Sequence, residues 1–303
     1  MKAIVFANTG DPREVLELRD VAEPTPKAGE VVVEVTARPI HPSDFFFVRG
    51  AYRIRPALPQ IAGLSGAGKV VNGDPSVGLQ RGTRVAFRWP GAWAERVAVP
   101  AERTFPLPKD VSDDDGAQLP LNPITAWGLL DMANVMPGDW VGVTAPTSSV
   151  AQLVTALAEM RDVHTVPIES ASDAALTESV RARTGGKGLT ALLDSVGGSL
   201  VERLFGAMRP GGTIIAYGTL SNESITLRNA TLIYANLSWR GFGVDGWLAS
   251  VTRDERARML DVLHAAMRDR RLPLPVRARF ALADFQRALR TAEESALGKV
   301  FLQ

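Results

Sequence analysis

From residue 140 to residue 217 the chain alternates short apolar runs, typical of strands, with segments that have helical apolar spacing. This order limits the fold more than any other feature, because strands joined through helices pair in parallel and need helices on both faces of their sheet. The sequence therefore predicts an α/β fold with a doubly wound parallel sheet. The predicted strands are Trp140–Thr144, His164–Ile168, Leu189–Val196 and Gly212–Tyr217, and the predicted helices are Ser148–Met160, Ala171–Arg183, Ser199–Met208 and Arg253–Arg271.

The first third of the chain has a different pattern. β-branched runs at Ala3–Phe6, Val15–Leu18, Glu30–Val35 and Ala67–Val71 are separated by turns rich in Gly and Pro. RGTRVAF and GAWAERVAVP continue this pattern, which is typical of a small barrel or sandwich. The helical pattern begins near Ser112, and strand, helix and strand return at the end of the chain, so we expect a discontinuous first domain.

The turn between the first strand and first helix of the α/β region contains no glycine. It reads VTAPTSSVAQ, and its window Pro146–Ala151 aligns with G-x-G-x-x-G, the pattern that brings backbone close to a pyrophosphate. The hydroxyls of Thr147, Ser148 and Ser149 could donate to phosphate, but Ser148 and Ser149 could equally cap the helix without a ligand. The added Cβ atoms, and a proline that lacks an amide, oppose close approach of a phosphate.

Seven segments carry a resemblance to a known family. They are IHPSDFFFVRGAY, AGLSGAGKVV, GAWAERVAVP, LPLNPITAWGLLDMANVMPGDWV, LLDSVGG, RPGGTIIAYG and LSWRGFG. Their order and spacing resemble the medium-chain dehydrogenase/reductase superfamily over nearly the whole chain. The shorter motifs RGAY and NPITAW resemble those of its zinc-free quinone oxidoreductases and, most closely, its enoyl thioester reductases.

This resemblance implies two domains with a cleft between them. A GroES-like β-barrel catalytic domain would comprise residues 1–115, with residues 266–303 returning to it, and a Rossmann-type nucleotide-binding domain would comprise residues 116–265. The resemblance also implies NADPH or NADH as hydride donor and a homodimer formed through the Rossmann sheets. The apolar, β-prone segment LSWRGFGV, after an expected edge strand, supports that interface.

The zinc ligands of zinc-dependent relatives are not matched. His41 stands at the first ligand position, Leu64 and Ser65 replace a His-Glu pair, and Leu121 falls near the last ligand. One imidazole cannot form a three-ligand catalytic site, so no metal is expected. For His41 two interpretations remain open: a ring beside the nicotinamide, or a structural histidine before Pro42 that is hydrogen-bonded to backbone.

The resemblance assigns the reaction to few side chains. Reduction of an enoyl thioester places negative charge on the thioester oxygen, and that charge needs a donor. Tyr52 matches the catalytic tyrosine in RGAY, although it could be a loop tyrosine that packs against the barrel edge. Thr125 matches a threonine beside nicotinamide and substrate, and Asn122 matches the first residue of NPITAW; a backbone-bonded threonine and an N-cap asparagine are the structural alternatives.

The four arginines around RGAY allow two interpretations. Arg49, Arg53 and Arg55 flank Tyr52 in the sequence, and Arg88 is expected nearby in the fold. Four cations at the mouth of a cleft could hold the phosphates of a thioester carrier. A solvated charged face is the simpler interpretation, and we favour it.

The adenosine half of the cofactor site departs from the family pattern. A complete βαβ unit needs about 30 residues, and between Met160 and Val180 only one strand and part of a helix fit. Glu169 is the nearest candidate for the ribose-binding acid, and it favours a free 2′-hydroxyl over a 2′-phosphate. The other cofactor contacts implied by the resemblance are Val150, Val196, Tyr217, Gly218, Phe242 and Val244.

Composition limits the partners and the location. The net charge is +1, from 34 basic and 33 acidic residues, so neither nucleic acid nor a membrane surface is an expected partner. No apolar run is long enough to cross a bilayer or to form a signal-peptide core, and there is no cysteine. We therefore expect a cytoplasmic protein that acts on a small molecule.

Two functions from different classes follow. The first is a zinc-free oxidoreductase that reduces an activated alkene, an enoyl thioester or a quinone with NAD(P)H. The second is a binding or scaffold protein that keeps the fold but has an impaired nucleotide site. NPITAW and Tyr52 favour the enzyme, whereas the loop without glycine and the shortened sheet favour the scaffold.

Overall fold

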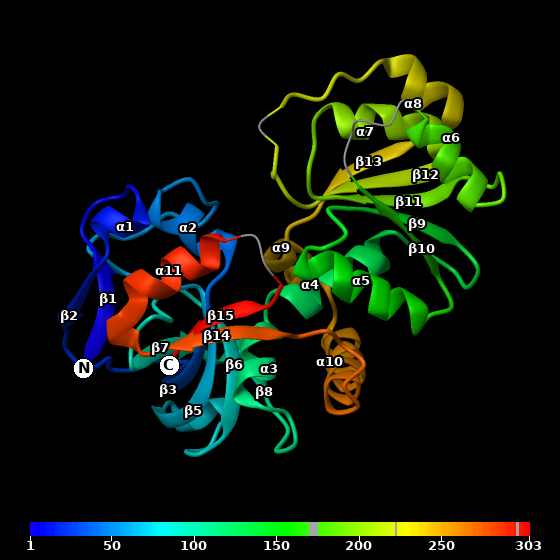
Figure 1. Ribbon diagram of the computed structural model, residues 1–303. Coiled ribbons are helices and arrows are strands. Elements are labelled where there is room, and N and C mark those ends of the chain that lie inside the picture. The colour runs from blue at the N-terminus through cyan, green and yellow to red at the C-terminus, as the bar shows by residue number, and fades with distance from the viewer. Residues whose placement is uncertain (170–174, 222, 295–296) are drawn as a thin grey trace. The chain divides into compact units, whose positions relative to one another are not determined.

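The computed structural model divides into two compact units (Figure 1). The first comprises Met1–Leu121, His264–Arg270 and Leu274–Gln303, and the second comprises Asn122–Leu263 and Arg271–Pro273. The structure describes residues 1–169, 175–221, 223–294 and 297–303. Each unit has its own sheet, and the two are described separately below.

The first unit is built mainly from short strands. Its elements are β1 (Lys2–Phe6), α1 (Pro12–Val15), β2 (Glu17–Asp20), β3 (Glu30–Pro39), α2 (Pro42–Val48), β4 (Gln60–Ile61), β5 (Ser65–Gly73), β6 (Arg84–Arg88), β7 (Arg96–Pro100), β8 (Thr104–Pro106), α3 (Asp113–Gln118), β14 (Val276–Phe280), α11 (Phe285–Glu293) and β15 (Lys299–Leu302). Seven strands form one sheet in the order β14-β15-β3-β5-β6-β8, with β7 also paired to β3, and β2-β1-β4 form a smaller sheet. The strands that return from the end of the chain thus extend the sheet of the N-terminal half.

The core of this unit is built from the apolar residues that alternate along its strands. Alternate residues of β3, namely Val31, Val33 and Val35, join a cluster with Phe47 and Trp93. Gly63 lies beside that tryptophan in the left-handed region, with φ +82°, and a Cβ built on it would stand 2.2 Å from the indole. Only glycine satisfies both conditions, so the chain can pass closely over the buried ring.

One predicted strand in this unit is partly wrong. Val15 ends the short helix α1, and the strand β2 begins at Glu17. The side chain of Asp11 accepts a hydrogen bond from the Arg13 amide at 2.9 Å, and Pro12 occupies the first helical turn. This local cap starts a helical turn ahead of the β-prone residues. The helix α2, within IHPSDFFFV, was not predicted either.

The second unit confirms the parallel sheet. Its five strands lie in the order β10-β9-β11-β12-β13, and every neighbouring pair is parallel. The chain moves outward from β9 to β10 and then crosses to β11, which makes the ends of β9 and β11 the topological switch point. Its elements are α4 (Asn122–Met132), β9 (Trp140–Thr144), α5 (Ser149–Glu159), β10 (His164–Ile168), α6 (Leu176–Arg183), β11 (Leu189–Asp194), α7 (Ser199–Leu204), β12 (Met208–Ala216), α8 (Asn229–Ala235), β13 (Ser238–Gly241), α9 (Val244–Ser250) and most of α10 (Arg253–Arg268).

The predicted shortening of this sheet is confirmed among the described residues. β10 is paired only with β9, so it forms an edge of the sheet. Pro167 lies within β10 and is exposed, and proline is tolerated in a strand only where no neighbour needs its missing amide. The first part of the predicted helix Ala171–Arg183 lies outside the described residues, and α6 occupies its second part.

Among the described residues, no helix combines the length and the apolar character needed to cross a bilayer.

Candidate active-site residues in the two units

In the first unit, the start of α2 is held by a buried carboxylate. Asp44 is fully buried, and its two oxygens accept hydrogen bonds from the His41 amide at 2.7 Å and the Leu64 amide at 2.9 Å. Burial raises the pKa of Asp44 to about 6, against the smaller lowering effect of those bonds and of nearby cations. Asp44 therefore fixes the backbone of His41 against the residue that precedes β5.

The ring of His41 is buried but has no hydrogen-bond partner. Only 1% of the residue is exposed, and neither ring nitrogen is bonded. Burial, together with the positive charges of Lys299 and Arg88, holds the pKa of His41 well below its ordinary value, so the imidazole is neutral. Both interpretations of His41, a ring beside the nicotinamide and a structural histidine before Pro42, stay predictions.

Tyr52 lies in the segment after α2 and packs partly against the barrel core. Nη2 of Arg88 donates a hydrogen bond to the Tyr52 hydroxyl oxygen at 2.8 Å. The guanidinium of Arg53 lies 5.8 Å from the centre of the Tyr52 ring. Tyr52 thus packs as a barrel-edge tyrosine does, yet its hydroxyl is held by a specific donor.

The four arginines do not form one surface. Arg49 and Arg55 are exposed; the first lies 3.9 Å from Glu293, and the second donates to the Gly50 carbonyl at 2.9 Å. Arg88, at the end of β6, is only 5% exposed. Its inclusion in a solvated face was wrong, because the strand carries its side chain inside the barrel.

In the second unit, the loop without glycine contains one residue in a strained conformation. Ala145 follows β9 and has φ +47°, the left-handed region that glycine normally occupies. Ser148 is the N-cap of α5, and its hydroxyl accepts a hydrogen bond from the Ala151 amide at 3.3 Å. The predicted cap is therefore present, and phosphate contacts of Thr147, Ser148, Ser149 and Val150 stay predictions.

A buried network joins the ends of β9 and β11. The hydroxyl of Thr144 donates to Asp194 at 3.0 Å and accepts from the Ser195 amide at 2.9 Å. The Asp194 carboxylate also accepts from the amides of Val196 and Gly197, each at 3.0 Å. This network fixes Val196 at the carboxyl edge of the sheet, where ligands of such folds bind.

Tyr217 and Gly218 follow β12 at the same edge. The Tyr217 hydroxyl is buried and forms no hydrogen bond, and burial raises its pKa, partly opposed by the nearby hydroxyls of Ser195 and Ser148. A Cβ built on Gly218 would stand 2.7 Å from the Ser195 carbonyl oxygen, so only glycine permits this approach. A buried hydroxyl without a partner indicates a place for a polar ligand.

Three of the remaining predicted residues of this unit follow the strands β10 and β13, and two lie on α4. Glu169 directly follows β10 and is exposed, Phe242 directly follows β13, and Val244 begins α9 and is buried. Asn122 and Thr125 are buried at the start of α4, and Nδ2 of Asn122 has no partner. A Cβ on Gly128 of α4 would stand 2.8 Å from the Phe242 ring, so this helix packs against the residue after β13.

Sequence reasoning missed Asp44 and Asp194 and the bond between Arg88 and Tyr52. Asp194 could have been found from the sequence, because a carboxylate that ends a buried, mainly apolar strand must find partners at the sheet edge. Asp44 follows Pro42 at the position where an acid stabilises a helix N-terminus, so it could have been found as well. The bond between Arg88 and Tyr52 joins positions 36 residues apart and has no local signal.

The barrel unit and the five-stranded parallel sheet define a GroES-like domain and a Rossmann-type domain. Residues 27–109 match the alcohol dehydrogenase GroES-like domain, and residues 143–264 match the domain described as zinc-binding dehydrogenase. The mitochondrial enoyl-(acyl-carrier-protein) reductase of Mus musculus is 30% identical over 315 residues, which cover 95% of this chain and 84% of the relative. The chain belongs to the medium-chain dehydrogenase/reductase superfamily, as the resemblance of its motifs indicates.

Solved structures agree with this membership. The crystal structure of a putative NADPH:quinone reductase from Bacillus thuringiensis is 29% identical, with a TM-score of 0.89 over 100% of this chain and 98% of the other. A mycobacterial protein solved in complex with NADPH is 27% identical, with a TM-score of 0.86 over 100% and 99% of the two chains. The predicted relation to enoyl reductases and quinone reductases is thus confirmed.

The zinc named in the second domain's description does not fit the residues present. The chain has no cysteine, and at the positions matched to the family's ligands Leu64 and Leu121 have no donor atom. Across the described residues, no group of three or more His, Asp or Glu side chains is arranged to hold a metal ion. His41 alone cannot hold a catalytic zinc.

Proposed function

We propose that this protein is a zinc-independent NAD(P)H-dependent oxidoreductase that reduces an activated alkene, such as an enoyl thioester, or a quinone. The names of its enoyl reductase and quinone reductase relatives support this class. The observation that carries the proposal within this chain is Tyr52, the family's catalytic tyrosine by motif, whose hydroxyl is held by a buried arginine at 2.8 Å.

The chemistry divides between the two units. The nicotinamide, when bound, supplies a hydride to the substrate. Tyr52 supplies the proton, because a phenol is protonated at neutral pH and its ring packs against apolar substrate. Thr125 and Asn122, both buried at the start of α4, orient the reacting groups through their hydroxyl and amide. His41, neutral because burial lowers its pKa, contacts the nicotinamide, as its motif position predicts.

The second unit holds the cofactor. The amides at the start of α5 and the hydroxyl of Thr147 receive the pyrophosphate. The unpartnered Tyr217 hydroxyl, together with Val196, Gly218, Phe242 and Val244, lines the remainder of the site. The relatives solved with NADPH support a nicotinamide dinucleotide. Glu169 points to weak binding with little preference for the 2′-phosphate, because a carboxylate repels that group.

We also propose that the protein is a homodimer formed through the second unit, and that it acts in the cytoplasm. Within the described residues β13 has a neighbouring strand on one side only, and such an edge can pair with a second copy. Ile233 and Tyr234, on α8 just before β13, are 69% and 88% exposed. Two large exposed apolar side chains beside an open sheet edge favour a covered surface.

The test has a binding arm and an activity arm. The six tryptophans allow a fluorescence titration with NADPH and with NADH, and reduction of a medium-chain enoyl thioester and of a quinone is then followed by loss of nicotinamide absorbance. We expect saturable binding and turnover of at least one substrate. We also expect Tyr52→Phe to bind the cofactor normally and to lower kcat for the thioester about 100-fold. Binding of neither cofactor and no turnover would favour the scaffold interpretation.

A further inference from the structure

Arg88 is a charged residue that is buried inside the barrel, which is an unfavourable place for a cation. It ends β6, is 5% exposed, and lies in a barrel whose core is mainly apolar but also buries Arg38, His41 and Asp44. Burial lowers the pKa of its guanidinium, which shows how unfavourable the site is for a cation, although arginine keeps its charge in proteins. An apolar side chain of similar volume would fill this place at less cost. The side chain is therefore best explained by what its donors do.

Arg88 donates a hydrogen bond to the hydroxyl of Tyr52, which is the proton donor of the proposed reaction. The distance from Nη2 to the Tyr52 oxygen is 2.8 Å, an ordinary length for a strong hydrogen bond. Arginine only donates, so the Tyr52 oxygen must be the acceptor in this bond. The proton of the phenol then points away from Arg88, and the hydroxyl can rotate less freely than it would in water.

Among the charged groups around this pair, Arg88 is the cation that donates to the Tyr52 hydroxyl. Asp44 is buried nearby, but both of its oxygens accept backbone amides. His41 is neutral, because burial lowers its pKa. Burial also lowers the pKa of Lys299 to about 8, partly opposed by Asp44, so Lys299 is still mainly a cation at neutral pH. The guanidinium of Arg53 lies over the Tyr52 ring, 5.8 Å from its centre.

We propose that Arg88 is the positioning residue for proton transfer from Tyr52. It holds the phenol oxygen in one orientation, and its charge stabilises the phenolate that remains when the proton leaves. This inference rests on the proposed function. In the step, hydride from the nicotinamide reduces the β-carbon of the alkene. The O–H bond of Tyr52 then breaks, the α-carbon gains the proton, and the electron pair stays on the phenolate oxygen until solvent returns a proton.

The proposal predicts how Arg88 and Tyr52 depend on each other. Without Tyr52 there is no phenolate to stabilise, so loss of Arg88 should then have no further effect on the chemical step. Lysine keeps the charge but lacks the planar fork that reaches the oxygen, so Arg88→Lys should recover only part of the activity that Arg88→Met loses. A residue that acts only by supporting the barrel would lower activity equally in both backgrounds.

The kinetic test is a double-mutant cycle on the full chain. We expect Arg88→Met to lower kcat at least tenfold while the cofactor titration is unchanged, and Tyr52→Phe to lower it about 100-fold. The double variant should match Tyr52→Phe within about twofold, because the two groups act as one unit. A further tenfold loss in the double variant would overturn the role of Arg88. A wild-type protein that reduces no substrate would instead overturn the proposed function.

A second measurement does not depend on activity. The chain has three tyrosines, so labelling them with carbon-13 at Cζ gives a spectrum in which Tyr52→Phe identifies the Tyr52 signal. Arg88→Met should move that signal and leave those of Tyr217 and Tyr234 in place. The matched control is Arg55→Met, which removes an exposed arginine that donates to the Gly50 carbonyl and should move none of the three. An unmoved Tyr52 signal in folded Arg88→Met would overturn the proposal.

Discussion

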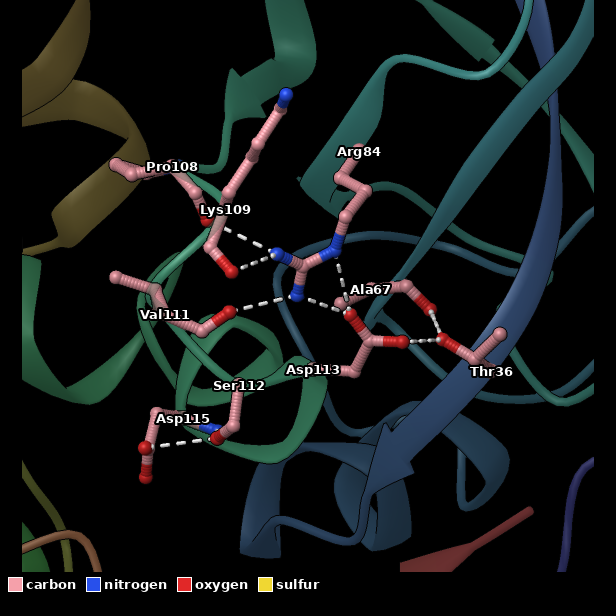
Figure 2. Close-up of polar contacts among 9 residues, drawn as sticks. All are labelled: Thr36, Ala67, Arg84, Pro108, Lys109, Val111, Ser112, Asp113 and Asp115. Carbon is pink, nitrogen blue, oxygen red and sulfur yellow. Dashed lines mark hydrogen bonds and ion pairs between the residues drawn. The ribbon is translucent and has the colours of Figure 1, made fainter.

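Arg84 donates from both Nε and Nη2 to the same carboxylate oxygen of Asp113, at 3.1 and 2.5 Å (Figure 2). Its other contacts are the carbonyl oxygens of Pro108, Lys109 and Val111, at 2.9, 3.4 and 2.6 Å. These carbonyls belong to a segment between β8 and α3 that has no regular secondary structure. One side chain of β6 therefore donates to the carbonyls of this irregular segment.

Removal of this arginine should destabilise the first unit. Asp113 also accepts a hydrogen bond from Thr36 at 2.7 Å, so Arg84→Ala leaves a partly buried carboxylate and three carbonyls with fewer donors. Each such charge-assisted bond contributes about 1.5–3 kcal/mol, and the site is partly exposed to solvent. We therefore expect a loss of about 2–3 kcal/mol in the free energy of unfolding. Urea denaturation measures it. The exposed Arg81→Ala is the control, and an equal loss there would contradict this explanation.

The elements whose bounds were predicted best are those marked both by their own residues and by the turn residues directly around them. The strands Trp140–Thr144 and His164–Ile168 have the predicted bounds, because each is an apolar run closed by turn residues. Val15 was misassigned because a cap four residues earlier outweighed β propensity. The edge position of β10 could be inferred from the short spacing that follows it, and Pro167 agrees with it.

The candidate site was predictable only in part, for a physical reason. Ser148 as an N-cap and Tyr217 at a strand end follow from local order along the chain. The burial of Arg88 does not, since hydropathy places arginine at the surface and only the β3–β5–β6 pairing carries it inward. The left-handed backbone conformation of Ala145 could not be predicted from the sequence either, because an alanine does not indicate a positive φ.

The protein should be more stable with glycine in place of Ala145. A left-handed conformation is unfavourable by about 1–2 kcal/mol for a residue with a Cβ, and φ here is +47°. Glycine loses more chain entropy on folding, so we expect Ala145→Gly to gain about 0.5–1 kcal/mol. Thermal and urea unfolding measure the change. Ala151→Gly, inside α5 with ordinary helical backbone, should lose about 0.5–1 kcal/mol. Destabilisation by Ala145→Gly would show that its methyl group contributes packing that outweighs the strain.

Asp44 should give the first unit a pH-dependent stability. Its pKa is raised by burial to about 6 from 3.8. The folded state therefore binds this proton more tightly than the unfolded state. The resulting stabilisation is complete below pH 3.8 and is lost as the pH rises through 6. A shift of this size corresponds to about 3 kcal/mol.

The measurement compares wild type with Asp44→Asn in urea at pH values from about 4 to 7. The variant loses one of two acceptors at every pH, so only the change in the difference is informative. We expect wild type to lose about 2.4 kcal/mol relative to the variant over this range, because part of the full effect lies below pH 4. Asp74→Asn is the opposite control, since hydrogen bonds from backbone lower the pKa of Asp74 and its contribution is lost as pH falls. A constant difference for Asp44→Asn would contradict the assignment.

The proposed dimer should depend on the apolar residues beside β13. Ile233→Asp places a charge on a surface that the dimer would bury, and burial of an unpaired carboxylate is strongly unfavourable. We expect a dimeric mass for wild type by light scattering at micromolar concentration and a monomeric mass for the variant. Leu58→Asp, at a 45% exposed position of the first unit, should leave the mass unchanged. Wild type that is monomeric under these conditions would exclude the dimer.

The loop without glycine should limit cofactor affinity, and its side chains can be removed. Ser148→Gly with Ser149→Gly deletes two Cβ atoms beside the expected pyrophosphate. It also deletes the Ser148 cap on the Ala151 amide, and loss of a cap to glycine costs only a few tenths of a kcal/mol, about 0.3. We therefore expect tighter binding of both NADH and NADPH, with nearly unchanged stability.

Glu169 should set the balance between the two cofactors. It stands at the end of β10, where an acid binds a free ribose 2′-hydroxyl and repels a 2′-phosphate. Contacts of a charged donor to phosphate contribute about 1.5–3 kcal/mol, so their absence lowers NADPH affinity about ten- to a hundredfold. Wild type should then bind NADPH no better than NADH, and Glu169→Gln should improve NADPH binding alone. The exposed Glu178→Gln, in α6, is the matched control. Fluorescence titration decides the matter: tenfold tighter binding of NADPH by wild type would mean that a basic side chain elsewhere holds the 2′-phosphate.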